Sequence, residues 1–281
     1  MHYLKKGVKI LKKLSIGCFD TGVGGISVVK EIKRLLPKES IEYFADHAHQ
    51  PYGSRSQKEI EGFVIQIINF LLEKGIKVCI IGCNVATAAG LRRAKKYFDI
   101  PIIGLIEPGA KAVEATNNGK IGILGGNFTV NRRHVAKAYN KEIIKFFPKA
   151  EIFTKYCPKF APLVESGQFE IAEAYQIAKE YLKPMKKAKI DTLVLGCSHY
   201  SFLQKVISDT MGIKVKLVDP AYNTVMILKQ ILEEKHLLKV NGDKQDNYYT
   251  TGDLYNMQNM QKFLRIIFNF PEFNIEEVKV L

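Results

Sequence analysis

The sequence lacks any apolar run of the length that a membrane-spanning helix requires, which is about 20 residues. Its apolar stretches are short, as at Val78–Ile81 and Leu193–Leu195. The first residues alternate lysines with aliphatic side chains and show neither a continuous apolar core nor a small-residue cleavage site, so we expect no signal peptide. A hydrophobic fraction of 47% with 25% charged residues is typical of a globular protein in water. These features favour a cytoplasmic protein without a membrane partner.

Paired cysteine motifs are also missing. The chain has five cysteines, an odd number, and no two of them are spaced as C-x-x-C. We therefore expect free thiols in a reducing compartment and no disulfide framework. Two thiols with too few nearby ligands do not make a zinc site either, so we predict no metal.

Signatures of nucleic-acid binding are absent, although the formal net charge is +14. The lysines are spread along the chain in pairs such as Lys12–Lys13, Lys95–Lys96 and Lys186–Lys187. Such a distribution is typical of a solvated surface. We therefore expect no nucleic-acid partner, while a basic field of this kind would still attract an anionic substrate.

What the sequence does contain is a repeated order of strand, loop and helix. Strands are predicted at Leu14–Phe19, Ile41–Ala45, Val78–Ile81 and Ile102–Ile106. Helices are predicted at about Ile26–Leu36, Gln57–Lys74 and Ala86–Tyr97. This alternation predicts an α/β fold with mostly parallel sheets covered by helices on both faces.

A weak internal repeat divides the chain into two similar α/β halves. Leu14–Gly25 resembles Gly119–Thr129, and Val78–Asn84 (VCIIGCN) resembles Thr192–Ser198 (TLVLGCS). The chain is expected to cross to the second half near Glu107–Pro108–Gly109 and to return near Asp219–Pro220. We therefore predict a discontinuous first domain, residues 1–107 with 222–281, and a second domain, residues 108–221.

The repeat matches two cysteines, Cys83 and Cys197, each of which follows an apolar strand and a glycine and precedes a predicted helix. The carboxyl ends of strands face the ligand crevice in open α/β sheets. A helix N-terminus at that edge stabilises a thiolate. Two facing halves would thus place one thiol on each side of one cleft, whereas Cys18, Cys79 and Cys157 are interpreted as buried small hydrophobic residues.

The segment Asp20–Gly25 is the first loop between a strand and a helix. It has a rival interpretation as a dinucleotide fingerprint, with Asp46 placed for a ribose contact. Ser27 in place of the third glycine and the negative charge of Asp20 argue against it, and the lysine of a P-loop is missing. A glycine loop that opens a helix can instead hold a carboxylate through backbone N–H groups.

Further polar residues lie near these motifs. His199 is two residues from Cys197 and is placed to relay a proton, and Glu165 ends the segment Pro162–Glu165. Tyr52, Gly53 and Ser54 form a polar turn after Pro51 that is suited to a small ligand.

Taken together, six segments resemble the glutamate racemase family, within the aspartate/glutamate racemase superfamily. In order they read IGCFDTGVGG, YFADHAHQPYGSRS, IGCNVATA, IGLIEPGA, CPKFAPLVESG and LVLGCSHY. The resemblance runs from about Leu14 to Asp253 and gives no role to residues 1–13. It implies two pseudosymmetric, doubly wound domains with the active site between them, and cofactor-independent interconversion of L- and D-glutamate for peptidoglycan synthesis. It also leads us to expect a homodimer.

The resemblance further implies roles for individual residues. Cys83 would remove the α-proton of the D-isomer and Cys197 that of the L-isomer. Asp20 and His199 would assist the neighbouring thiols, and Glu165 would be a further auxiliary group. The implied substrate contacts are Asp20, Thr21, Pro51, Tyr52, Gly53, Ser54, Asn84, Val85, Thr129, Ser198 and His199.

Several positions depart from the family pattern. Thr21 and Ser198 exchange one hydroxyl residue for another, but Val85 stands where threonine is usual, and Gly126 and Phe128 alter the usual Thr-x-Gly-Thr. Losing a hydrogen bond to a charged ligand group costs about 1.5–3 kcal/mol. Two alternatives therefore stay open, a racemase of aspartate or another acidic amino acid, and a binding protein that has drifted from catalysis.

Overall fold

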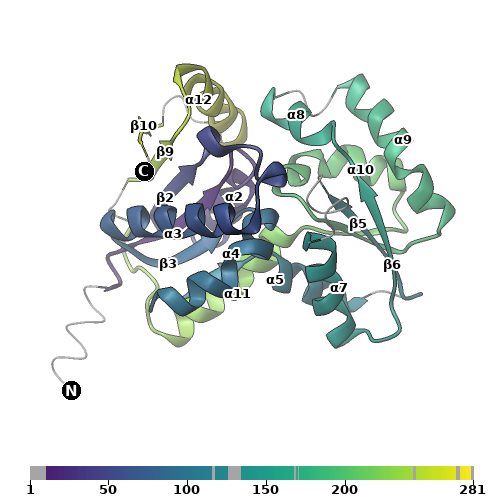
Figure 1. Cartoon of the computed structure of the whole chain (residues 1–281), viewed down its shortest axis with the longest axis horizontal. Helices are drawn as coiled ribbons and strands as arrows, with labels where there is room; N and C mark the ends of the chain where they lie inside the picture. The colour runs from purple at the N-terminus through teal and green to yellow at the C-terminus, as the bar shows by residue number, and fades with distance from the viewer. Residues whose placement is uncertain are drawn as a thin grey trace.

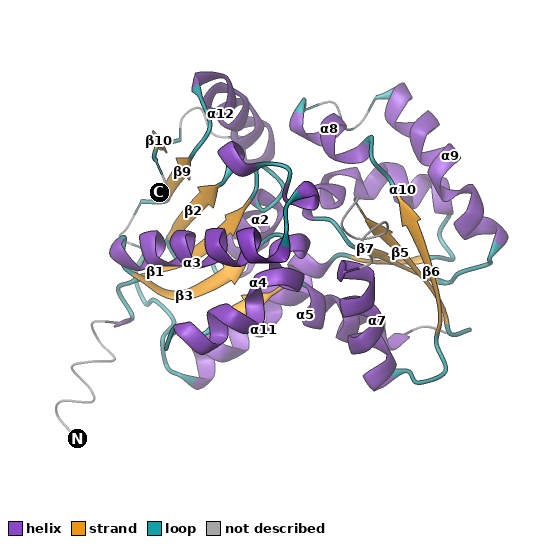
Figure 2. Cartoon of the chain, in the orientation of Figure 1, coloured by secondary structure: helices purple, strands orange, loops and turns teal. Residues whose placement is uncertain are grey.

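The computed structural model describes residues 11–115, 118–125, 134–167, 169, 171–242, 245–269 and 273–279. Its strands form two β-sheets that lie apart in the molecule, and helices surround each of them (Figures 1 and 2). Every strand pairing between described residues is parallel, which confirms the predicted α/β class.

The first sheet has the strand order β10-β9-β2-β1-β3-β4. Its strands are β1 (Ser15–Asp20), β2 (Ile41–Ala45), β3 (Ile76–Ile81), β4 (Ile102–Gly104), β9 (Asn247–Thr250) and β10 (Ile275–Glu277). The second sheet has the order β6-β5-β7-β8. Its strands are β5 (Lys120–Gly125), β6 (Glu151–Tyr156), β7 (Thr192–Leu195) and β8 (Lys216–Val218).

The helices alternate with the strands along the chain. The longer ones are α2 (Ile26–Leu35), α3 (Gln57–Glu73), α4 (Asn84–Tyr97), α7 (His134–Phe146), α9 (Ala172–Lys187), α10 (Gln204–Met211), α11 (Pro220–Glu234) and α12 (Leu254–Phe268). The shorter ones are α5 (Ile106–Lys111), α8 (Phe160–Glu165) and the 3-10 turns η1 (His47–His49), η2 (Tyr52–Ser54), η3 (Ala112–Ala115) and η4 (Ser198–Leu203). Within the described ranges, no helix has the length and apolarity to cross a membrane.

The two sheets repeat one strand order. Strands β2-β1-β3-β4 of the first sheet and β6-β5-β7-β8 of the second are the same arrangement four strands apart. In a 2-1-3-4 order, ligands bind at the carboxyl ends of the first and third strands, where the winding reverses. The third strands are β3 and β7, and Cys83 and Cys197 follow them. We propose that the sheets mark the two domains predicted from the repeat, with α11 on the return path packed against α2 and α5.

Alternation of side chains along the strands explains the layers. On β1, Ile16 and Cys18 belong to one apolar core, whereas Phe19 belongs to the other. The first core includes residues of α2, α9, α10, α11 and α12, and the second includes residues of α3, α4 and α7. Because side chains in a strand point to alternate faces, each sheet is buried on both sides.

Hydrogen bonds explain two element boundaries that differ from prediction. The fourth strand ends at Gly104 and not at Ile106, because the backbone N–H of Leu105 donates to the side chain of Thr87 at 3.3 Å and the chain then enters α5. The crossing segment Glu107–Pro108–Gly109 is therefore helical. Helix α4 begins at Asn84, because the carbonyl of Cys83 already accepts from the backbone N–H of Thr87.

Candidate active site

Cys83 and Cys197 line one cavity of about 530 Å³. Each is the N-cap residue of a helix, Cys83 for α4 and Cys197 for the 3-10 helix η4. The backbone before each cysteine extends the parallel ladder in the same way: Gly82 N–H donates to Phe19 C=O at 2.7 Å, and Gly196 N–H donates to Leu124 C=O at 2.8 Å. The matched cysteines thus occupy equivalent positions in the two sheets.

A glycine is required before Cys197. A Cβ atom added at Gly196 would lie 2.5 Å from the carbonyl oxygen of Leu124, which belongs to the neighbouring strand. Only a residue without a side chain lets the chain pass this close and aim the next residue at the cavity.

The structure brings the sequence-predicted residues that it describes together around this cavity. The lining includes Asp20, Thr21, Pro51, Tyr52, Gly53, Ser54, Cys83, Asn84, Val85, Glu165, Cys197, Ser198 and His199. Thr129, Gly126 and Phe128 lie outside the described residues.

Cys83 is held as a neutral thiol. It is buried, and burial raises its pKa well above the ordinary value for a cysteine. The nearby charge of Asp20 raises the pKa further, whereas backbone N–H groups of Ala86 and Val85 at the start of α4 lower it. Cys83 is therefore suited to donate a proton. The backbone N–H groups in the first turn of α4 can then stabilise its thiolate.

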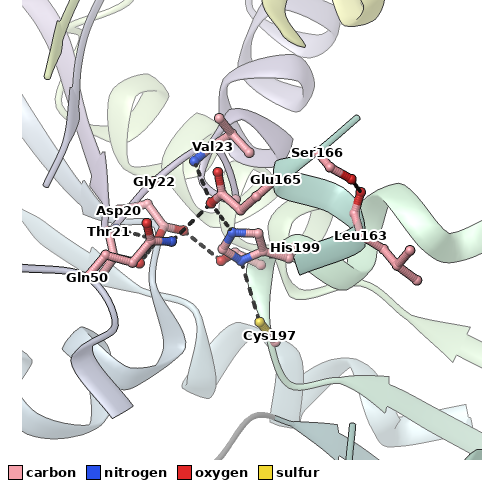
Figure 3. A network of polar contacts seen from close by, with 12 residues as sticks. Asp20, Thr21, Gly22, Val23, Gln50, Leu163, Glu165, Ser166, Cys197 and His199 are labelled. Atoms are coloured by element: carbon pink, nitrogen blue, oxygen red, sulfur yellow. Dashed lines mark hydrogen bonds and ion pairs between the residues drawn. The ribbon is translucent and has the colours of Figure 1, made fainter. Parts of the chain in front are cut away.

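Cys197 has a different environment, because His199 lies beside it. Nδ1 of His199 is 3.7 Å from Sγ of Cys197, and Nε2 of the same ring is 2.6 Å from Oε1 of Glu165 (Figure 3). Burial opposes the charged imidazolium, but its contacts with Cys197 and Glu165 outweigh burial and raise the pKa of His199 well above its ordinary value. The ring can accept the thiol proton on Nδ1 and donate from Nε2 to the carboxylate.

Glu165 receives three donors on a single oxygen. Besides His199, Oε1 accepts from the amide of Gln50 at 3.1 Å and from the backbone N–H of Val23 at 3.3 Å. Burial would raise the pKa of Glu165, but the bond and charge of His199, with smaller contributions from His47 and Gln50, lower it to about 2. The backbone N–H of Val23 in the glycine loop thus binds the protein's own carboxylate of Glu165.

Asp20 links the two halves of the site. Its Oδ2 accepts from the hydroxyl of Ser198 at 2.6 Å, and its Oδ1 accepts from the backbone and hydroxyl of Thr21. Burial raises the pKa of Asp20, against the lowering effects of His199, Ser198 and Thr21. Asp20 acts on Cys83 through its charge, while its carboxylate oxygens accept hydrogen bonds from Thr21 and Ser198.

Asn84 presents a donor to the site. Its Oδ1 accepts from the hydroxyl of Tyr139 at 2.8 Å, and Tyr139 comes from α7 of the other half. Among the described residues, the buried Nδ2 of Asn84 has no hydrogen-bond partner. A buried N–H donor of this kind favours a ligand with an acceptor, such as a carboxylate.

The polar turn after Pro51 is anchored within the protein. The Tyr52 hydroxyl donates to Oδ2 of Asp46 at 2.6 Å, and the Ser54 hydroxyl donates to the carbonyl of Pro51 at 3.0 Å. Asp46 also accepts from Thr251 at 2.8 Å. The Asp46 carboxylate thus has protein partners, which argues against its proposed use on a ribose.

The other three cysteines are buried in the cores, as predicted. Cys157 also contributes to the cavity lining, and its thiol is 3.7 Å from the carbonyl of Lys155. Over the described part of the chain, no group of three or more His, Cys, Asp or Glu side chains is arranged to hold a metal ion.

Comparison with known proteins agrees with this arrangement. Residues 17–227 match the family model described as Asp/Glu/Hydantoin racemase. A glutamate racemase of Geobacter metallireducens is 39% identical over 241 residues, which are 85% of this chain and 88% of that protein. The chain belongs to the glutamate racemase family.

Solved structures of the family have the same fold. The glutamate racemase isoform RacE1 of Bacillus anthracis superposes with a TM-score of 0.87 at 34% identity, over 96% of this chain and 98% of that one. The glutamate racemase of Francisella tularensis superposes with a TM-score of 0.85 at 30% identity, over 96% and 99% of the two chains, and that structure contains D-glutamate.

Gln50 and Tyr139 are among the polar residues near the site that sequence reasoning missed. Gln50 directly precedes the recognised segment Pro51–Ser54, so its position was a usable signal. Tyr139 lies on the buried face of amphipathic α7, where a tyrosine looks like any core residue. Its contact with Asn84 joins residues 55 positions apart and has no local signature.

The glycine loop leaves room for the histidine that serves Cys197. A Cβ added at Gly24 would lie 2.6 Å from both Nδ1 of His199 and Oγ of Ser198. We expect Gly24→Ala to displace His199 and to lower kcat/KM about 10-fold, since small misplacements of catalytic groups are costly. Steady-state kinetics with Gly62→Ala as the control checks this, because a Cβ at Gly62 in α3 meets no atom within 4 Å. Equal activity of the two variants would contradict the expectation.

Proposed function

We propose that this chain interconverts L- and D-glutamate by a two-base mechanism. The observation that carries the proposal is the placement of Cys83 and Cys197 at equivalent strand ends on a shared cavity. Two thiols from two opposed halves can reach the two faces of one α-carbon. A binding protein that had drifted from catalysis would need neither thiol.

Conversion of the L-isomer begins at Cys197. His199 Nδ1 takes the thiol proton, which leaves a thiolate paired with an imidazolium that Glu165 stabilises. The thiolate removes the α-proton, so the C–H bond breaks, an S–H bond forms and the electron pair stays on carbon. Cys83 then donates its thiol proton to the opposite face of the carbanion. The D-isomer follows the reverse course from the Cys83 thiolate.

The carbanion forms next to a carboxylate, so the site has to stabilise additional negative charge. The free Nδ2 of Asn84 is a donor for a substrate carboxylate, and the Tyr139 hydroxyl fixes which way the amide points. The Val85 and Ala86 N–H groups at the start of α4 stabilise the Cys83 thiolate when it forms. This assignment uses only residues of the chain and requires no cofactor.

The comparison with relatives favours glutamate as the substrate. These relatives are named glutamate racemases, and they share 30% identity or more with this chain over most of their length. Val85 remains the observation in favour of a second substrate such as aspartate, because its side chain lines the cavity without a hydroxyl. The hydroxyls of Thr21 and Ser198 both engage Asp20.

The wider role belongs to the same proposal. D-glutamate would be supplied for peptidoglycan, in the cytoplasm, where a reducing environment suits the five free thiols. The homodimer stays a prediction, and sedimentation of the purified chain tests it.

The proposal is tested by incubating the protein with L- and D-glutamate and with both aspartate enantiomers in deuterated water. We expect glutamate to be inverted and to gain deuterium at its α-carbon. Circular dichroism measures the inversion, and NMR measures the deuterium. Faster inversion of aspartate would move the proposal to the second substrate. Absence of α-deuterium from every amino acid tested would reject racemisation.

A further inference from the structure

Within the substrate-facing loop, residues 50–54, the side chain of Gln50 forms a hydrogen bond with the acid–base residues of the opposite half. Its Nε2 donates to Oε1 of Glu165 at 3.1 Å. Figure 3 shows Gln50 approaching this carboxylate from the side of Asp20, while Glu165, His199 and Cys197 come from the other half of the site. The contact joins residues 115 positions apart.

The backbone that carries Gln50 is firmly anchored. Gln50 is the C-cap of η1, and its backbone N–H donates to the carbonyl of His47 at 3.1 Å. Nδ1 of His47 is 2.7 Å from the hydroxyl of Thr250, and Nδ1 of His49 is 2.9 Å from Asp46. The amide of Gln50 is therefore presented from a fixed support.

Glu165 is less constrained by packing than its partner. Its side chain keeps 24% of its exposure, against 6% for His199, and it is the last residue of the short helix α8. Its position depends on the three donors that meet at Oε1, and two of these, Gln50 and the Val23 N–H, come from the opposite half.

We propose that Gln50 is a positioning residue that holds the Glu165 carboxylate against His199 and so orients the His199–Cys197 pair. The inference rests on the two-base function proposed above. It also implies that ordering of the substrate-facing loop is coupled to the alignment of His199 with the Cys197 thiol. Without the Gln50 donor, the carboxylate can rotate toward the cavity and His199 is then less well aligned with the thiol.

The coupling is expected to affect one of two proton transfers. L- and D-glutamate have equal free energies in solution, so kcat/KM has to remain equal in the two directions for every variant. The isotope effect of an α-deuterated substrate need not remain equal. If only the transfer at Cys197 slows, the isotope effect on kcat/KM should rise with L-glutamate, whose α-proton Cys197 removes. It should fall with D-glutamate, for which Cys197 only returns a proton.

The test compares Gln50→Met, which keeps the length of the side chain but has no donor, with Gln50→Asn, which keeps the amide one methylene too short. The matched control is Gln230→Met, since Gln230 donates to Glu234 at 2.7 Å on the exposed face of α11. We expect both Gln50 variants to lower kcat/KM about 10-fold, as for loss of one bond to a charged acceptor, and to show the opposite changes in isotope effect. The control should match the unaltered protein.

Two results would overturn the role of Gln50. One is unchanged kcat/KM in both Gln50 variants. The other is a loss of activity with equal changes in isotope effect for the two enantiomers, as a general structural defect would give. Absence of glutamate racemisation by the unaltered protein would instead reject the proposed function, and this role with it, so the two failures are distinguishable.

Discussion

Replacing either Cys83 or Cys197 by alanine is expected to lower the rate of racemisation by about 10²–10⁴-fold, the usual contribution of a positioned acid or base. The two variants should differ in what they still do. With Cys83→Ala, Cys197 still reaches the L-face, so L-glutamate should exchange its α-proton for solvent deuterium without inversion. With Cys197→Ala, D-glutamate should show the same exchange. Loss of the α-proton signal in deuterated water measures both.

The matched control for this pair is Cys79→Ala. Cys79 is a fully buried cysteine in β3, four residues before Cys83, and it does not line the cavity. Its replacement should affect stability but leave kcat/KM within a factor of two or three of the unaltered protein. Racemisation at the native rate by either site variant would reject the two-base assignment, and so would exchange of the same enantiomer by both.

Replacing Glu165 by glutamine is expected to lower kcat/KM at pH 7 about 100-fold. The carboxylate is one of the two groups that raise the pKa of His199, so its loss lowers that pKa and makes His199 a weaker acceptor for the thiol proton. The limb of the kcat/KM profile that follows His199 should therefore move to lower pH in the variant. The pH profile of kcat/KM measures this, and a profile parallel to that of the unaltered protein would contradict it.

Glu165→Gln should also change the free energy of unfolding in a pH-dependent way. The pKa of Glu165 is lowered to about 2 in the folded protein, so its contribution is present above the ordinary carboxyl value of 4.5 and is lost as the pH falls toward 2. The raised pKa of His199 gives a contribution that is complete below 6.5 and is lost as the pH rises through the folded value. Between pH 4.5 and 6.5, Glu165→Gln should therefore be less stable by roughly 2–3 kcal/mol. Denaturant unfolding at several pH values measures the difference, which should shrink toward pH 2.

Glu151→Gln provides the control for this experiment. Glu151 lies on β6 and forms an exposed ion pair with Lys120 at 3.6 Å. An exposed pair contributes about 0–1 kcal/mol, so this variant should be nearly as stable and as active as the unaltered protein. Equal destabilisation of both glutamine variants would show that the Glu165–His199 pair has no special strength.

Much of the fold follows from local patterns in the sequence. The strand at Ile41–Ala45 and the helix that begins at Gln57 were both predicted from the sequence, and the structure places β2 and α3 there. The end of β4 could not be predicted, because it depends on the Thr87 side chain 18 residues away. The two matched Gly-Cys pairs indicated an internal repeat, and the repeated strand order of the two sheets confirms it.

Site residues could be predicted only where a reactive residue type stands at a recognisable position in the sequence. Cysteines after strands and a histidine two residues from one of them have recognisable patterns. The convergence of Val23, Gln50 and His199 on Glu165 joins four separate segments of the chain, and no local pattern reports it. The glycine loop was expected to be able to hold a carboxylate in place of a pyrophosphate, and only the folded chain shows that its Val23 N–H donates to Glu165.

The central claim, that two thiols act on opposite faces of one carbon, is tested most directly by the fate of the α-proton. The unaltered protein is incubated with L-glutamate in deuterated water, and both enantiomers are separated early in the reaction and examined by mass spectrometry. Two bases predict that the D-glutamate formed carries deuterium from the first turnovers, while the remaining L-glutamate keeps its proton. D-glutamate that retains the substrate's own proton would show that one base serves both faces, and would contradict the account.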